Sequence, residues 1–369
     1  MMNRSIRRAN ILTKLVSKIL YAKLTRQRCP IFMGLYITNR CNLRCSYCFV
    51  NVDNRMDNPC RRGFTKDEIF KQVDELYAMG MRWVFMLGGE PLEHENIGEI
   101  VKYITDKGIL LHLLTNGTLI EQKIDAIEAA DGVCVSIDGG EEATDKLRGK
   151  GVFRRALRGA EIALSRGMNT RIHAVLNKYS FNDMEMLANI AREKGLTITL
   201  SPINDAECKN DPNSEFVMTD EEYRNFYIQY RKLKEKGYPI ANSYYAIDKV
   251  INWPIGYHER IAPEQSFHGY KVIPCVMAET HACIDAEGAM FTCIQQFMDG
   301  LNIKEVGIKE AWDYLPNKRK RCNSCASMNT IETAAYLRLR PEIIMEGIKF
   351  FFGRRKSISN EKLCQKLHK

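Results

Sequence analysis

Three cysteines, Cys41, Cys45 and Cys48, lie on one short stretch of the chain with the spacing C-x3-C-x2-C. Three thiolates on a single tight loop can hold an iron–sulfur cluster and still leave one iron without a protein ligand. Structural clusters and structural zinc sites are normally closed by four protein ligands, so a set of three suggests a site that binds a further molecule. A zinc knuckle or three unrelated thiols is the simpler alternative.

Three other polar motifs each follow an apolar run. They are Gly88-Gly89-Glu90-Pro91, Thr115-Asn116-Gly117 and Ser136-Ile137-Asp138-Gly139. Paired glycines let the backbone come close to a ligand, and the Glu90 carboxylate could receive an ammonium group. A β-turn followed by an ordinary carboxylate at a helix start is the alternative for the first motif, and Asn-Gly is first of all a turn signal.

Apolar runs of strand length alternate six times with amphipathic stretches of helical length. The expected strands are Ile31–Ile37, Trp83–Leu87, Ile109–Leu114, Val133–Ile137, Arg171–Leu176 and Leu196–Leu200. The expected helices span residues 65–79, 96–107, 119–130, 153–166, 181–194 and 219–236. This alternation predicts an α/β fold with a parallel sheet and right-handed crossovers.

Six such units suit a partial (β/α)6 barrel, with a doubly wound open sheet as the alternative. The cysteine loop then follows the first strand, and each of the three polar motifs follows a strand of its own. Ligands bind at the carboxyl ends of parallel strands in both folds. We therefore expect all four motifs to meet at one cavity.

The combination of motifs over residues 31–201 resembles the radical S-adenosylmethionine (SAM) enzymes. The resemblance implies that Cys41, Cys45 and Cys48 hold a 4Fe–4S cluster whose open iron binds SAM. In this family the glycine-rich segment receives the methionyl amino group, and a strand-end Ser and a later Arg contact the rest of the molecule. The cofactor-binding residues carried over in this way are Tyr47, Gly88, Gly89, Glu90, Ser136, Arg148 and Asn177.

The resemblance also implies the individual roles of these residues. Arg148 would pair with the SAM carboxylate through its planar fork, and a solvated helix charge is the alternative. Ser136 would touch the ribose or the carboxylate, and Asn177 is a weaker ribose candidate. The resemblance implies reductive cleavage of SAM to a 5′-deoxyadenosyl radical that abstracts hydrogen from a substrate. An external donor such as flavodoxin or ferredoxin would supply the electron, and no catalytic side chain is needed for this initiation.

The second half of the chain contains another set of cysteines. Cys275 and Cys293 flank a predicted hairpin that turns at Glu287-Gly288, and Cys322 and Cys325 follow with the spacing C-x2-C. Four such thiolates can bind a cluster or zinc. The region resembles the auxiliary-cluster extension called SPASM, or its shorter form, twitch, with fewer cysteines than the full pattern. It implies one auxiliary 4Fe–4S cluster, in which Cys283 could replace Cys275.

The net charge of +9 is concentrated at the two ends of the chain. Residues 1–28 contain eight basic residues and no acidic one. Leu12, Leu15, Val16, Ile19 and Leu24 fall near one face of a helix there, and residues 341–356 join an apolar stripe to a basic cluster. Basic amphipathic helices suit an anionic membrane surface, and packing against the barrel is the alternative. The pattern is unlike a uniformly basic nucleic-acid-binding surface.

These observations predict four regions. They are a basic amphipathic helix (1–30), the radical SAM partial barrel (31–240), the auxiliary-cluster region (241–335) and a basic C-terminal helix and tail (336–369). Thirteen cysteines without a secretory signal indicate a reduced, cytoplasmic protein. Its substrate is expected to be a peptide, a lipid-linked molecule or a small molecule, and peripheral contact with the inner face of a membrane is a further expectation. A non-catalytic iron–sulfur or zinc protein is the alternative function.

Overall fold

The computed structural model describes residues 4–50, 57–58, 63–203, 216–293, 300–319 and 322–353. Its central feature is a run of six parallel strands in chain order. They are β1 (Phe32–Tyr36), β2 (Trp83–Leu87), β3 (Leu110–Thr115), β4 (Gly132–Ser136), β5 (Asn169–Leu176) and β6 (Thr197–Pro202). Each predicted strand is present within two residues of its expected ends, which confirms the α/β partial barrel.

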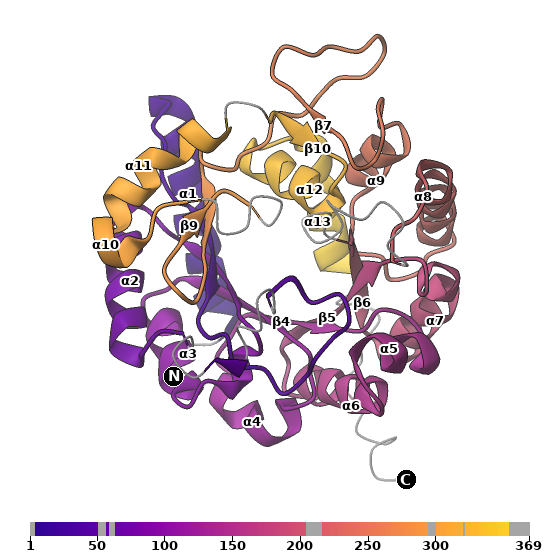
Figure 1. The fold of residues 1–369 in the computed structure, drawn as a ribbon, viewed down its shortest axis with the longest axis horizontal. Helices are drawn as coiled ribbons and strands as arrows, with labels where there is room; N and C mark the ends of the chain where they lie inside the picture. The colour runs from indigo at the N-terminus through magenta and orange to yellow at the C-terminus, as the bar shows by residue number, and fades with distance from the viewer. Residues whose placement is uncertain are drawn as a thin grey trace.

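Helices cover the outside of this curved sheet (Figure 1). The predicted ones are α2 (Lys66–Met79), α3 (Ile97–Asp106), α4 (Ile120–Ile127), α6 (Val152–Ser165), α7 (Met184–Lys194) and α8 (Asp220–Glu235). Alternate strand residues, such as Ile172 and Ala174 of β5, are fully buried in the core that the sheet shares with the helices. Their neighbours Arg171 and His173 are only partly buried, as expected for the inner face of a barrel that is not closed.

Helix caps determine where several of these elements begin. Thr65 accepts a hydrogen bond from Glu68 N while the Glu68 side chain returns to Thr65 N, a complete capping box at the start of α2. Thr219 and Glu222 repeat the arrangement at α8. Each cap satisfies backbone donors that a helix leaves free at its first turn.

Shorter elements that the sequence pattern did not indicate lie between these units. The helical ones are the 3-10 helix Pro91–Glu93, α5 (Glu141–Arg148), α9 (Tyr244–Ile251), α10 (Ile303–Val306), α11 (Ile308–Arg319) and α12 (Met328–Leu337). The 3-10 helix Phe181–Asp183 falls at the start of the helix expected at 181–194, and α13 (Pro341–Gly353) falls in the expected C-terminal helical region. A second, two-stranded sheet joins β7 (Arg260–Ile261) to β10 (Ser324–Cys325) in antiparallel pairing. The predicted tail beyond residue 353 lies outside the described residues.

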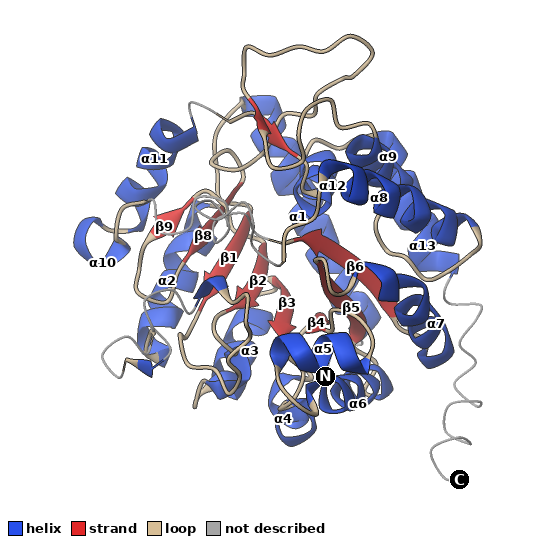
Figure 2. Ribbon diagram, turned by 45° about the vertical axis from the view of Figure 1, so that its right-hand side comes forward, coloured by secondary structure: helices blue, strands red, loops and turns tan. Residues whose placement is uncertain are grey.

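The predicted hairpin consists of β8 (His281–Ile284) and β9 (Met290–Phe291). The Asp285 carboxylate holds its turn by accepting from the backbone N–H groups of Glu287, Gly288 and Ala289. The hairpin extends the main sheet, because β8 pairs in parallel with β1 on the side away from β2 (Figure 2). The second half of the chain therefore shares a sheet with the barrel.

The N-terminal basic stretch forms α1 (Arg4–Thr25), which packs on the barrel. The structure corrects the single apolar face that was expected: Leu15 and Ile19 are buried, whereas Leu12, Val16 and Leu24 are exposed. The reason is geometric, because the apolar arc is wider than the surface of the barrel that the helix covers. No helix in the described part of the chain is both long enough and apolar enough to cross a bilayer.

Candidate active site

The three-cysteine loop leaves the carboxyl end of β1, as its position in the sequence predicts. Cys41, Cys45 and Cys48 are half-buried free thiols. A turn brings Cys48 N within 3.2 Å of Cys45 O, and Ser46 N donates to Leu147 O at 2.9 Å. The second contact fastens the loop to the end of α5. The donor set therefore consists of three thiols on one anchored loop.

Tyr47 connects this loop to β4 and α5. Its hydroxyl donates to Asp138 Oδ2 at 2.6 Å and accepts from Arg148 Nη2. Arg148 also makes a two-point ion pair with Asp138, which lies just beyond β4. Burial opposes the charge on Arg148, but the Asp138 carboxylate offsets it and holds the guanidinium pKa well above its usual range. Asp138, to which the sequence analysis assigned no role, is thus the centre of the network.

The glycine-rich segment lies directly against the residues that lead into Cys41. Gly89 N donates to Thr38 O at 2.7 Å, and Glu90 N donates to Arg40 O at 2.7 Å. A Cβ on Gly88 would lie 2.5 Å from Thr38 O. Glycine is therefore required here by the close approach of two backbone segments of the chain itself, whereas the motif was singled out for the approach of a ligand.

Glu90 is almost fully buried and is held by three donors. Oε1 accepts from Thr115 Oγ1 at 2.7 Å and from Leu92 N at 3.1 Å, and Oε2 accepts from Asn116 N at 2.7 Å. Burial raises the pKa of this carboxyl to about 7, against the effect of the hydrogen bonds. The carboxylate thus joins the motif after β2 to the motif after β3.

Asn116 continues this connection to the cysteine loop. Its Nδ2 donates to Asn42 Oδ1 at 2.8 Å and lies 4.0 Å from Cys41 Sγ. Burial raises the pKa of the Cys41 thiol to about 12, the N–H of Leu43 opposes this, and the Glu90 charge adds to it. Asn42 escaped the sequence analysis, because only the folded chain places an asparagine of the loop opposite Asn116.

Ser136 and Asn177, the remaining predicted cofactor ligands, follow neighbouring strands. Ser136 is the last residue of β4 and lies opposite His173 of β5. Asn177 follows β5 and is fully buried, with Nδ2 donating to Val175 O at 2.8 Å and Oδ1 accepting from Tyr179 N at 2.9 Å. The structure therefore brings all the predicted SAM-site motifs to the carboxyl edge of one sheet, while the Asn177 amide serves its own backbone.

The second cysteine set comes together from three segments. Cys275 N donates to Asn323 O at 2.7 Å, which joins the segment before β8 to the one that holds Cys322 and Cys325. Burial is the main cause that raises the pKa of the Cys325 thiol. Its other raising causes are the charges of Cys275, Cys293 and Cys322. Cys283 lies in β8, where a Cβ on Gly34 would meet its Sγ at 2.7 Å. Burial is the main cause that raises the pKa of its thiol, and the charge of Cys293 is the next.

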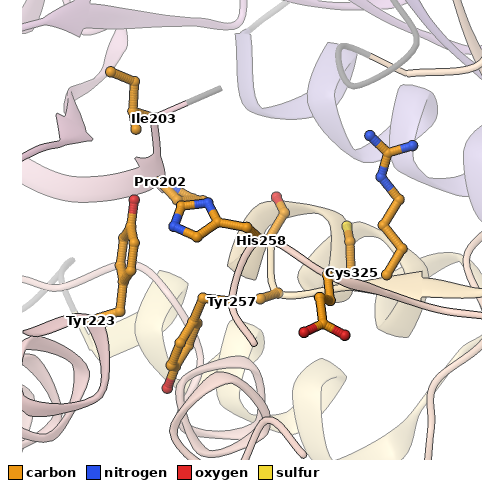
Figure 3. A pocket seen from close by; sticks show the side chains of 10 residues that line it. Pro202, Ile203, Tyr223, Tyr257, His258 and Cys325 are labelled. Carbon is orange, nitrogen blue, oxygen red and sulfur yellow. The ribbon is translucent and has the colours of Figure 1, made fainter. Parts of the chain in front are cut away.

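A small hollow lies beside this second set (Figure 3). Pro202 and Ile203 at the end of β6 form one wall, and Tyr257 and His258 form another. Cys325 lies on its rim. The hollow therefore runs from the carboxyl end of the barrel to the second cysteine set.

Both cysteine sets suit iron–sulfur clusters in their donor chemistry, since they offer free thiols and no competing disulfide among the described cysteines. Within the described ranges, no group of three or more His, Cys, Asp or Glu side chains is already gathered tightly enough to hold a metal ion. Loading either site would draw its thiols together.

Comparison with known proteins gives the same assignment. Residues 35–191 match the family model of the radical SAM superfamily. The Fe-coproporphyrin III synthase of Methanosarcina barkeri is 25% identical over 300 residues, which cover 76% of this chain and 73% of that protein. The mycofactocin maturase MftC of Mycolicibacterium smegmatis is 24% identical over 323 residues, covering 80% and 75% of the two chains.

Solved structures agree on the fold. SuiB of Streptococcus suis bound to its precursor peptide SuiA superimposes with a TM-score of 0.63 at 16% identity, over 87% of this chain and 73% of that one. The protein anSMEcpe with bound AdoMet and a peptide gives 0.59 at 18% identity, over 79% and 82%. With the cysteine loop and its supporting motifs at the expected edge of the sheet, residues 35–191 of the chain belong to the radical SAM superfamily of enzymes.

Proposed function

We propose that this enzyme modifies a peptide by radical chemistry, using SAM and two iron–sulfur clusters. Cys41, Cys45 and Cys48 would hold the SAM-binding 4Fe–4S cluster. One auxiliary 4Fe–4S cluster would be held by Cys275, Cys293, Cys322 and Cys325. The observation that carries the proposal is the meeting of the cysteine loop, Glu90 and the Tyr47–Asp138–Arg148 network at one strand edge.

The reduced cluster and SAM, when bound, supply an electron and a 5′-deoxyadenosyl radical that abstracts hydrogen from the substrate. The chain's own residues hold and orient the reactants. Tyr47 and Arg148 fix the cysteine loop against β4, so the three thiols that would hold the cluster are supported by the barrel. Gly88 and Gly89 let their segment pack against the backbone that leads into Cys41. This packing positions Glu90, which would accept the methionyl ammonium group.

The roles of Ser136, Arg148 and Asn177 toward SAM rest on the family pattern. The Nε and Nη2 groups of Arg148 already donate to Asp138, and Nη2 also donates to Tyr47. We propose that Arg148 pairs with the SAM carboxylate through the N–H groups that Asp138 and Tyr47 do not use. Asp138 would hold the guanidinium in place. Ser136, at the end of β4, is the ribose or carboxylate contact, and Asn177 is a weaker ribose contact.

A peptide is the substrate class that the relatives favour. The neighbours SuiB and anSMEcpe are recorded with bound peptides, and a peptide cyclase is among the relatives. Pro202 and Ile203 at the end of β6 line the same hollow as Cys325 of the auxiliary set, so the end of the barrel and this set lie close together. A lipid-linked or small-molecule substrate is the other possibility. The electron donor would be a flavodoxin or ferredoxin. The enzyme would be cytoplasmic, with peripheral contact to the inner face of the membrane.

Anaerobic reconstitution with iron and sulfide, followed by reduction in the presence of SAM, tests the proposal. We expect 5′-deoxyadenosine to form, and Cys45→Ala to abolish it. Cys134→Ala is the matched control, because this free thiol lies in β4 away from both sets and its loss should leave cleavage intact. Absence of 5′-deoxyadenosine with both clusters loaded would refute the proposal.

A further inference from the structure

The outer face of α1 is the largest gathering of exposed apolar side chains in the described part of the chain. Seven large hydrophobic residues are exposed in the described part of the chain, and five of them belong to α1. Their exposed fractions run from 43% to 83%. The five are Leu12, Val16, Leu20, Tyr21 and Leu24. We refer to them as the α1 stripe.

The stripe is held in a fixed position. Leu12, Val16, Leu20 and Leu24 are spaced four residues apart and so form one row along the helix. The row beside it, Ile11, Leu15, Ile19 and Ala22, is buried against the barrel. Near the helix start, Arg7 pairs with Asp131 at 2.7 Å. Beyond its end, Arg28 donates to the carbonyls of Ala278 and Trp312, both at 2.7 Å.

The same contacts show which end of the barrel α1 covers. Asp131, the partner of Arg7, directly precedes β4. Lys14 Nζ lies 3.6 Å from the position that a Cβ of Gly108, just before β3, would take. Lys18 approaches Gly80 ahead of β2 in the same way. The helix therefore crosses the amino ends of the strands, opposite the cysteine loop.

Positive charge accompanies the stripe. Residues 1–28 contain eight basic residues and no acidic one. Lys14, Lys23 and Arg26 are exposed, and none of them forms an ion pair with an acid of the described residues. A second copy of the chain docked on this face would bring two such uncompensated clusters together, which like-charge repulsion opposes. An anionic lipid surface would satisfy both the charge and the apolar row.

We propose that the α1 stripe docks the enzyme on an anionic membrane surface, with the helix lying in the interface. The apolar row would enter the boundary between headgroups and acyl chains while the lysines and arginines contact lipid phosphates. Because α1 covers the amino ends of the strands, the cysteine loop then faces away from the bilayer. The inference stands apart from the reaction, and it favours a substrate that reaches the site from the aqueous side.

Sedimentation with vesicles tests this with the full-length, cluster-loaded protein. We expect binding to vesicles of phosphatidylcholine mixed with phosphatidylglycerol, weaker binding to phosphatidylcholine alone, and loss of binding in high salt. The variant Leu12→Ser/Leu20→Ser/Leu24→Ser should lower the partition coefficient by a factor of about ten or more. Met186→Ser, an exposed apolar residue of α7, is the matched control and should bind like the original protein.

The three substitutions affect exposed side chains, so iron content and the unfolding midpoint should stay unchanged and report correct folding. Equal binding by the triple variant and the original protein would overturn the proposal. Equal binding to vesicles with and without phosphatidylglycerol would also overturn it. A lipid-free dimer that the triple variant converts to a monomer would instead assign the stripe to self-association, and would equally overturn it.

Discussion

Arg148 Nε lies 2.7 Å from Asp138 Oδ2, and Arg148 Nη2 lies 2.9 Å from Oδ1, in a pair whose side chains are 8% and 0% exposed. The pair connects the end of β4 to the end of α5. Through Tyr47 it also reaches the cysteine loop. A buried charge of this kind depends on its partner, since removal of one member leaves the other uncompensated.

Asp138→Asn should therefore destabilise the fold by about 3–5 kcal/mol, as measured by urea unfolding. It should also lower the iron bound at the cysteine loop, because asparagine offers one acceptor oxygen where Asp138 offers two, and Tyr47 or Arg148 then loses a hydrogen bond. Asp125→Asn is the matched control: Asp125 pairs with Arg166 at an exposed position, where such pairs contribute less than about 1 kcal/mol. Similar losses in the two variants would contradict a special role for the buried pair.

Gly89→Ala should disturb the approach to Cys41. A Cβ at this position would lie 2.5 Å from Asn39 O and closer still to Arg40 O, both of which are backbone atoms. Separating the two segments misplaces Glu90, so we expect SAM cleavage to fall by about a hundredfold. Gly98→Ala, inside α3, meets only Ala126 Cβ at 3.3 Å and should leave the rate unchanged. An active Gly89→Ala enzyme would refute the close-approach argument.

Glu332 of α12 predicts a pH dependence of stability. Its carboxylate accepts from Ser243 N and Oγ, yet burial raises its pKa from 4.5 to about 7. The folded state therefore retains the proton, so this contribution is complete below pH 4.5 and is lost as the pH rises through 7. Across that pH range, Glu332→Gln should reduce the change in the free energy of unfolding by up to about 3 kcal/mol.

Glu342→Gln is the matched substitution for that measurement, because Glu342 is exposed at the start of α13. Its stability should follow the same pH curve as the original protein. Glu90, whose pKa is also raised to about 7, should leave part of the dependence in place. An unchanged slope in Glu332→Gln would show that Glu332 does not contribute.

Metal analysis tests the auxiliary site. The variant Cys41→Ala/Cys45→Ala/Cys48→Ala should retain about four irons per chain after reconstitution. Adding Cys325→Ala should remove them, whereas adding Cys283→Ala should not, since the cysteines whose charges raise the pKa of Cys325 are Cys275, Cys293 and Cys322. Zinc in place of the residual iron would overturn the assignment.

The barrel strands were predictable because their signals are local. The strand Trp83–Leu87 was placed at its observed ends, since an apolar run bounded by Gly80 and Gly88 leaves little choice. The helix Glu141–Arg148 escaped prediction because its segment is almost entirely polar and buries only a few side chains. The pairing of β8 with β1 joins residues far apart in sequence, and no local pattern records it.

In the candidate site, too, some residues could be predicted from local sequence and others could not. Cys41 and Gly89 were found because their types and spacing carry the chemistry. Asp138 was quoted within a motif without a role, although a carboxylate ten residues before Arg148 and just past a strand is a usable signal. The two rows of α1 could not be separated, because sequence shows how wide an apolar arc is and not how much of it a neighbour covers.

The position of β8 has a consequence for any attempt to shorten the protein. β8 satisfies the backbone groups on the side of β1 that β2 leaves open. A chain ending before His281 would turn β1 into a bare edge strand, a template for intermolecular pairing and aggregation. The isolated barrel is therefore expected to precipitate, and an inactive truncation would report a lost sheet neighbour as much as a lost cluster.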